Sequence, residues 1–155
     1  LIDRMAKEVP FTYGDTVTAY TISASGLTFV YSGTVKKVSQ PGHRQSLAKV
    51  KSEMVESLKA AAKRADGDSS PIVSSLLTLA VDLRVRADKG EDITVINASD
   101  FANTDSSKPK GTPFKDMNVI AVLPPSDGHA PTKRQAAIEL AQKIFSDAKS
   151  LHFCQ

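Results

Sequence analysis

The chain has 155 residues, of which 41% are hydrophobic and 24% charged, a composition typical of a globular domain and not of a disordered or fibrous protein. Its formal net charge is +3, but the basic residues are spread over several segments and aromatic residues make up only 6%, so no specific nucleic-acid binding is expected. No apolar run approaches the roughly 20 residues of a membrane-spanning helix, so no transmembrane segment is expected. The single cysteine, Cys154, excludes an intrachain disulfide and a cysteine-based zinc site.

The first elements in chain order are a short helix and two strands. Apolar residues at helical spacing predict a helix that ends before Pro10 (Ile2, Met5, Ala6 and Val9). Residues 16–22 and 27–31 are rich in β-branched side chains. The four small residues between these segments predict an antiparallel hairpin.

Two helices follow. After a polar connector, residues 36–42, an apolar stripe predicts a helix over residues 44–65. The next helix begins at Ser70-Pro71, where a hydroxyl at the N-cap precedes a proline at the first helical position, and it continues through residue 85. Its residues are apolar nearly all round, so we expect this helix to be buried.

Residues 93–96 and 119–123 are short continuous apolar runs, the pattern of strands covered on both faces by helices. Between them, residues 99–115 are polar and lack helical periodicity, and a loop of this length in a compact domain is often functional. A final helix is expected to start at Thr132. The residues at the C-terminal end are expected to fray, so a catalytic pair of His152 and Cys154 is not expected.

This order of elements predicts an α/β fold: a Rossmann-like three-layer sandwich with a mainly parallel sheet, helices on both faces and one antiparallel edge strand. The sequence contains no repeat, low-complexity tract or interdomain linker. Residues 1–155 are therefore expected to form a single domain.

The element order and two short motifs resemble the von Willebrand factor type A (vWA) domain. Ser69-Ser70-Pro71-Ile72 is similar to the second metal-binding loop of that family, with Ser70 in the place of a threonine. Residues 93–101 are similar to its fourth strand and the following loop, with Asp100 in the place of the family's aspartate and Phe101 in the place of its customary glycine. The resemblance runs from residue 2 to about residue 150, except that residues 99–115 stand where the family commonly has another helix.

In that family a metal-ion-dependent adhesion site (MIDAS) holds a cation, and a carboxylate of the protein partner completes the coordination. The resemblance implies that Ser70 and Asp100 are metal ligands and that Mg²⁺ is the cation, since hydroxyl and carboxylate oxygens suit a hard ion. It implies a non-enzymatic protein-binding module for adhesion or assembly, in which the turn before Pro71 and the turn behind Ile96 lie side by side. From position alone, Ser70 is favoured as a helix N-cap over a metal ligand, and the resemblance brings these two interpretations to about even. Asp100 is alternatively an ordinary loop carboxylate.

The family's first strand and its Asp-x-Ser-x-Ser motif have no counterpart in residues 1–155. Because a sheet of this kind cannot easily lose its central strand, we expect an upstream segment or another chain to supply that strand, so that the vWA-like domain is N-terminally incomplete here. Two ligand groups rarely hold Mg²⁺, so no tight metal binding is expected from these residues alone.

The main alternative is a Mg²⁺-dependent hydrolase or phosphotransferase of another α/β family, in which Asp100 and Asp105 bind the metal. The sequence has no glycine-rich phosphate-binding loop, nucleophile elbow or His-Glu-x-x-His motif, but such sites are also assembled from separate loops. A scaffold piece of a larger assembly that has lost its metal site is a third possibility.

Overall fold

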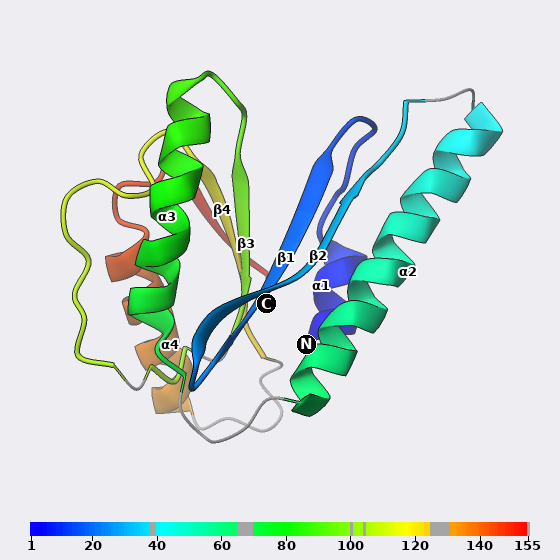
Figure 1. Ribbon diagram of the computed structural model, residues 1–155. Coiled ribbons are helices and arrows are strands. Elements are labelled where there is room, and N and C mark those ends of the chain that lie inside the picture. The colour runs from blue at the N-terminus through cyan, green and yellow to red at the C-terminus, as the bar shows by residue number, and fades with distance from the viewer. Residues whose placement is uncertain (38–39, 65–69, 100, 104, 125–130, 155) are drawn as a thin grey trace. The chain divides into compact units, whose positions relative to one another are not determined.

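The computed structural model of the chain describes residues 1–37, 40–64, 70–99, 101–103, 105–124 and 131–154 (Figure 1). It divides into two compact units, residues 2–68 and residues 69–155, the latter grouped with Leu1. Among the described residues these units contain four helices and two small sheets, so the chain is a mixed α/β protein. No helix in the described ranges is long and apolar enough to span a membrane.

The first unit is a hairpin that packs against a long helix. α1 (Ile2–Glu8) precedes the antiparallel strands β1 (Thr16–Ser23) and β2 (Gly26–Thr34), and α2 (Gln40–Arg64) packs on both strands. The predicted hairpin is therefore confirmed. Its two-residue turn is followed by Gly26 at φ 95°, a conformation that residues with a side chain rarely adopt. α2 begins before the predicted residue 44, since Pro41 is compatible with the first turn of a helix.

A β-bulge interrupts the register of this hairpin. Ala19 pairs with Tyr31 and Tyr20 pairs with Phe29, so Val30 is the extra residue. The Tyr31 hydroxyl donates a hydrogen bond of 3.0 Å to the Glu53 carboxylate on α2. Partial burial, followed by this bond and the negative charge of Glu53, raises the pKa of Tyr31 above its ordinary 10.0. The tyrosine therefore stays a neutral donor that links the hairpin to α2.

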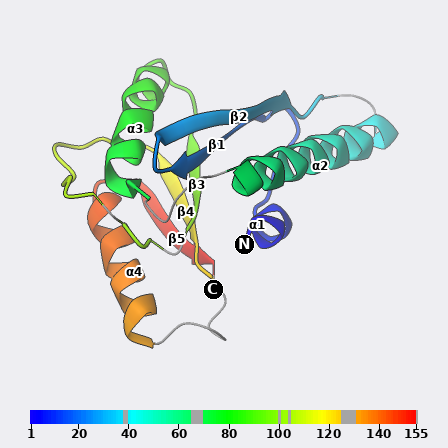
Figure 2. The ribbon, with the colours of Figure 1, turned by 60° about the horizontal axis from the view of Figure 1, so that its bottom comes forward.

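The second unit is built on a parallel sheet in the order β3-β4-β5 (Figure 1). Its strands are β3 (Thr94–Ala98), β4 (Asn118–Val122) and β5 (Ser150–Cys154). α3 (Ile72–Asp88) and α4 (Pro131–Ile144) lie on the same side of this sheet in both ribbon views (Figure 1, Figure 2). The prediction that residues 93–96 and 119–123 form parallel strands is confirmed.

The prediction that the C-terminal residues fray is wrong, because they form the strand β5. Leu151 pairs with Val119 and Phe153 pairs with Ala121, so the tail extends the parallel sheet beyond β4. His152 and Cys154 consequently lie two residues apart on one face of a strand. The reason given above against a catalytic pair, disorder of the tail, is therefore wrong, although the strand itself is no sign of catalysis.

The core of the second unit lies between the sheet and its helices. Val119 and Ala121 of β4 are fully buried, and the rings of Phe114 and Phe145 meet edge to face with 4.8 Å between their centroids. α3 buries one side only, because Val81 and Val85 are 66% and 53% exposed. The prediction that this helix is buried all round is therefore wrong.

Within the described residues, β1 and β2 pair only with each other and β3 pairs only with β4. The expected helices, antiparallel hairpin and parallel strands are thus present in the chain. A Rossmann-like sandwich also requires that the hairpin and the parallel strands join in one sheet with an antiparallel edge strand. This joined sheet remains a prediction, and so does the expectation that the chain forms a single domain.

A valine-to-alanine substitution should destabilise the protein more on the buried side of α3 than on its exposed side. Val73→Ala should lower the free energy of unfolding by about 2 kcal/mol, because it leaves a cavity beside a side chain that is 1% exposed. Val81→Ala, in the same helix but 66% exposed, should change it by less than about 0.5 kcal/mol. Urea denaturation measures both values, and equal losses would contradict the burial described for α3.

Candidate functional site

Ser70, the first predicted metal ligand, lies directly before α3. It is half-buried, and its carbonyl oxygen accepts a hydrogen bond of 2.8 Å from the amide of Ile72. The N-cap position is occupied by Pro71, which offers no side-chain bond to the helix. The interpretation of Ser70 as the N-cap is therefore wrong.

α3 is instead capped by two side chains from the loop that follows β3. The side-chain oxygen of Asn103 accepts hydrogen bonds from the amides of Ile72 (2.9 Å) and Val73 (3.2 Å). Asp105 Oδ2 accepts one bond of 3.0 Å from the Ser74 amide and another of 2.8 Å from the Ser74 hydroxyl. Because the first amides of a helix have no partner within it, these bonds satisfy the Val73 and Ser74 donors, and they give the Ile72 amide a second acceptor beside the Ser70 carbonyl. The carboxylate also lies at the positive end of the helix dipole.

These hydrogen bonds link residues that are 30 to 31 positions apart in the sequence. They hold the segment behind β3 beside the first turn of α3. Residues 65–69 of the turn before Pro71 lie outside the described residues, so the side-by-side arrangement of the two turns remains a prediction. Asp100, the second predicted ligand, lies outside the described residues. Its neighbours are described: the Ser99 amide donates to the carbonyl of Val122 (3.2 Å), and the Phe101 amide donates to the Ser99 hydroxyl (2.9 Å).

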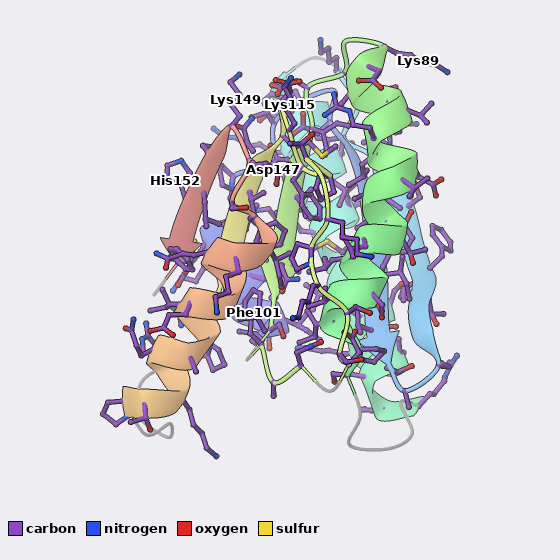
Figure 3. The ribbon with its side chains drawn as sticks, turned by 90° about the vertical axis from the view of Figure 1, so that its left-hand side faces the viewer. Lys89, Phe101, Lys115, Asp147, Lys149 and His152 are labelled. Carbon is purple, nitrogen blue, oxygen red and sulfur yellow. The ribbon has the colours of Figure 1, made fainter. Side chains whose placement is uncertain are left out.

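Phe101 has an unusual backbone conformation for a large residue. Its φ is +56°, in the left-handed region, and its side chain is only 4% exposed. Such a conformation destabilises the fold by on the order of 1–3 kcal/mol. Burial of the phenylalanine ring stabilises the fold by a similar free energy and so offsets this strain. This is the position at which the vWA resemblance expects a glycine, the residue that adopts a positive φ most easily. Figure 3 shows Phe101 at the end of the second unit opposite to Lys115 and Lys149.

Asp105 is held as a carboxylate. Partial burial alone raises its pKa, but hydrogen bonds from Ser74, Ser107 and Asn103 outweigh that effect and bring the pKa below the ordinary 3.8. Asp105 Oδ2 accepts two bonds from Ser74, and Oδ1 accepts one of 2.9 Å from the Ser107 amide. Of about four acceptor positions on a carboxylate, these bonds leave about one for any further partner.

The described residues do not by themselves form a site for Mg²⁺. Across these residues, no group of three or more His, Cys, Asp or Glu side chains could hold a metal ion. Ser70 has one side-chain oxygen, and the Asp105 carboxylate already accepts hydrogen bonds from Ser74 and Ser107. Because Mg²⁺ takes about six oxygen ligands in a near-octahedral arrangement, the ligand set needs further oxygens.

The polar loop is also held at its far end. The guanidinium of Arg84, in the last part of α3, donates to the carbonyl of Lys115 and pairs with Asp88 (2.7 Å) and Asp116 (3.4 Å). The loop therefore contacts α3 at both the first and the last turns. Sequence analysis marked the loop as a candidate functional segment but missed the contacts of Asn103, Ser74 and Arg84. The cluster of short polar residues soon after a buried strand was the one available signal for Asn103.

β3 carries a buried amide whose oxygen is not satisfied. Asn97 is 6% exposed, and its side-chain oxygen has no hydrogen-bond partner among the described residues. Leaving such a group unpaired costs about 1–3 kcal/mol. The outer edge of the same strand has no pairing partner in the described part of the chain. A buried polar atom and an open strand edge therefore occur together, three residues before Asp100.

The cap on α3 predicts a pH-dependent stability. Asp105→Ala should lower the free energy of unfolding by about 1 kcal/mol at pH 7, the usual loss for a helix cap. Because folding lowers the pKa of Asp105, its contribution is complete above the unfolded pKa of about 3.9 and disappears as the pH falls through the folded value. The difference in the free energy of unfolding between wild type and Asp105→Ala should therefore become smaller below about pH 4.

Asp82→Ala, which removes an exposed carboxylate from the middle of α3, is the matched control and should cost less than about 0.5 kcal/mol at either pH. Urea denaturation at pH 7 and at pH 3 measures both variants. An Asp105→Ala variant as stable as wild type at pH 7 would rule out the capping role.

Comparisons with protein-family models, with curated proteins and with solved structures give no match to this chain. The resemblance to the vWA domain therefore remains a prediction that rests on the element order and on the segments around Ser70 and Asp100.

Proposed function

We propose that this chain forms most of a vWA-type, non-enzymatic protein-binding module, whose protein partner docks where the loop behind β3 meets the start of α3. The observation that supports this most is the set of hydrogen bonds from the first turn of α3 to Asn103 and Asp105. These bonds bring together the two segments that flank Ser70 and Asp100. In open α/β sheets, ligands bind at the carboxyl ends of the strands, which is the end of β3 that carries this loop.

An added strand is the second part of the proposal. An upstream segment or another chain would pair with the open edge of β3 and join the hairpin and the parallel strands in one Rossmann-like sheet. Support comes from the backbone groups on that edge, which have no sheet partner among the described residues. The unsatisfied oxygen of Asn97, on the same strand, is further support, since a polar group brought in with the added strand would remove its cost.

In this proposal Ser70 and Asp100 hold Mg²⁺ together with ligands on the added strand. The cation would offer a coordination position to a carboxylate of the protein partner. Binding specificity would then come from the side chains around the loop behind β3, which is fixed to α3 at Asn103 and Asp105.

The enzymatic alternative has less support. A Mg²⁺-dependent hydrolase or phosphotransferase would need Asp105 as well as Asp100 to bind the metal, but Asp105 already accepts hydrogen bonds from Ser74 and Ser107. With three of its about four acceptor positions in use, this carboxylate has at most about one left for a metal ion while the cap is intact.

Titration calorimetry tests the proposed metal site. Residues 1–155 should bind Mg²⁺ or Mn²⁺ no tighter than about 1 mM, because too few oxygens are present. Fusing an apolar strand that ends in Asp-x-Ser-x-Ser ahead of Leu1 should tighten Mn²⁺ binding by about 100-fold or more, since three oxygen ligands are added.

In the fused protein Asp100→Ala should abolish this gain, and Asp82→Ala on the exposed face of α3 should preserve it. Thermal unfolding followed by circular dichroism first establishes that each fused variant is folded. The site is wrong if the folded fusion gains no affinity, or if the unfused chain binds with micromolar affinity that survives Asp100→Ala.

The proposal also predicts no turnover of phosphate esters by the fused protein in the presence of Mg²⁺. A screen with aryl phosphates checks this. Turnover that Asp100→Asn removes would favour the hydrolase or phosphotransferase instead.

A further inference from the structure

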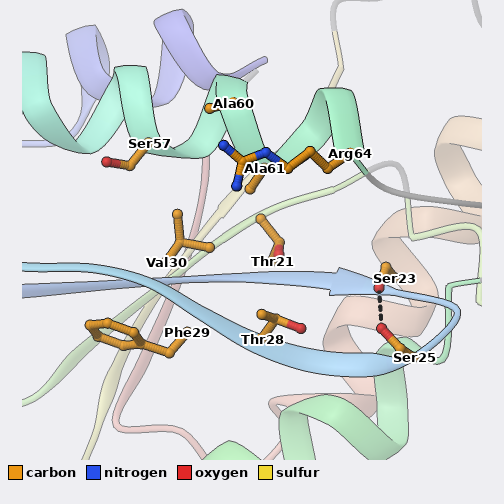
Figure 4. A pocket seen from close by; sticks show the side chains of 10 residues that line it. All are labelled: Thr21, Ser23, Ser25, Thr28, Phe29, Val30, Ser57, Ala60, Ala61 and Arg64. Atoms are coloured by element: carbon orange, nitrogen blue, oxygen red, sulfur yellow. Dashed lines mark hydrogen bonds between the residues drawn. The ribbon is translucent and has the colours of Figure 1, made fainter.

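A pocket of about 450 Å³ lies within the first unit, between the last turns of α2 and the turn end of the β1–β2 hairpin (Figure 4). Its residues come from both elements, so it is contained in one compact unit. The volume falls in the range of sites that hold small molecules, about 300–1,000 Å³.

Small side chains on α2 leave the space open. Towards the middle of the helix, Val50 and Met54 are buried against neighbouring residues, with 5% and 2% exposure. Beyond them the pocket is lined on the helix side by Ser57, Ala60 and Ala61, which are too short to fill it. On the opposite side the bulge residue Val30 lines the pocket, and bulges commonly re-aim side chains next to binding sites.

The lining is rich in hydroxyl groups and carries one cation. Five of the lining side chains are serine or threonine, none is a carboxylate, and Arg64 is the charged member. The hydroxyls of Ser23 and Ser25 lie 2.9 Å apart and are joined by a hydrogen bond (Figure 4). Figure 4 shows the Arg64 side chain lying back along α2 past Ala61, so that its guanidinium is on the side that faces the hairpin.

Some basic residues of this unit are held in ion pairs. Arg4 pairs with Glu8 and Lys59 pairs with Asp3, both at 2.7 Å. No ion pair of Arg64 is found among the described residues. A guanidinium offers five donors in a planar fork, which suits two oxygens of one phosphate or carboxylate.

We propose that this pocket binds a small phosphorylated molecule through its phosphate group. Arg64 would pair with two phosphate oxygens, and the hydroxyls of Thr21, Ser57 and their neighbours would donate to the rest. A phosphate uses more of these donors than a carboxylate does, because it presents three terminal oxygens. The end of α2 carries about half a negative charge, which the full positive charges of Arg64 and Lys63 outweigh. The volume left beyond the phosphate accommodates the organic part of an ester.

NMR titration of the full chain tests this proposal with inorganic phosphate and with glycerol 3-phosphate, against sodium chloride at equal ionic strength. Both phosphates should give saturable shifts of the Thr21, Ser23 and Arg64 amides, with dissociation constants on the order of 1 mM. Tighter binding of glycerol 3-phosphate would identify an ester as the ligand, and equal binding would identify the phosphate group alone.

Matched variants separate a specific site from general attraction. Arg64→Gln should weaken binding by about tenfold or more, the loss expected for a charge-assisted hydrogen bond, while Lys63→Gln should weaken it by less than about threefold. Ala61→Leu, which fills the pocket and keeps the charge, should also weaken binding by about tenfold or more. Chloride shifts equal to those of phosphate, or equal losses in Arg64→Gln and Lys63→Gln, would overturn the proposal.

Discussion

The unpaired donors at the start of α3 are the constraint on which the second unit depends. The amides of Val73 and Ser74 need partners that the helix itself does not supply, and the N-cap residue, Pro71, supplies no side-chain cap. Asn103 and Asp105 supply those partners from the loop behind β3. One requirement of helix chemistry thus fixes the position of a long polar loop, and with it the end of the unit where a ligand would bind.

The parallel sheet provides the frame for that end. Its central strand, β4, is buried through Val119 and Ala121, and β5 closes one side by pairing with it. The other side, at β3, combines an open strand edge with the unsatisfied amide oxygen of Asn97 within the described residues. The proposed function accounts for both features by an added strand with polar groups, and the proposed metal site depends on the same addition. The pocket beside Arg64 depends on neither, since it lies wholly in the first unit.

The sequence predicted the elements whose patterns are local. Helical spacing identified α1 and α2, the Ser70-Pro71 start identified α3, and continuous apolar runs identified β3 and β4. β5 was missed because a five-residue segment in which three residues are polar or small (Ser150, His152 and Cys154) resembles a frayed tail. The cap on α3 joins residues that are 31 positions apart in the sequence, so no local sequence pattern could predict it. The pocket could not be predicted from the sequence either, because it is the space between α2 and the hairpin that the short side chains of Ala60 and Ala61 leave empty.

Amide hydrogen exchange at the first turn of α3 tests the central claim most directly. If Asn103 and Asp105 hold this turn, Asn103→Ala should speed exchange of the Val73 amide by about tenfold or more, and Asp105→Ala should do the same for Ser74. The amide of Leu77, inside the helix, should keep its protection in both variants. Unchanged exchange at Val73 and Ser74 would contradict the account, because the loop behind β3 would then not be anchored to α3.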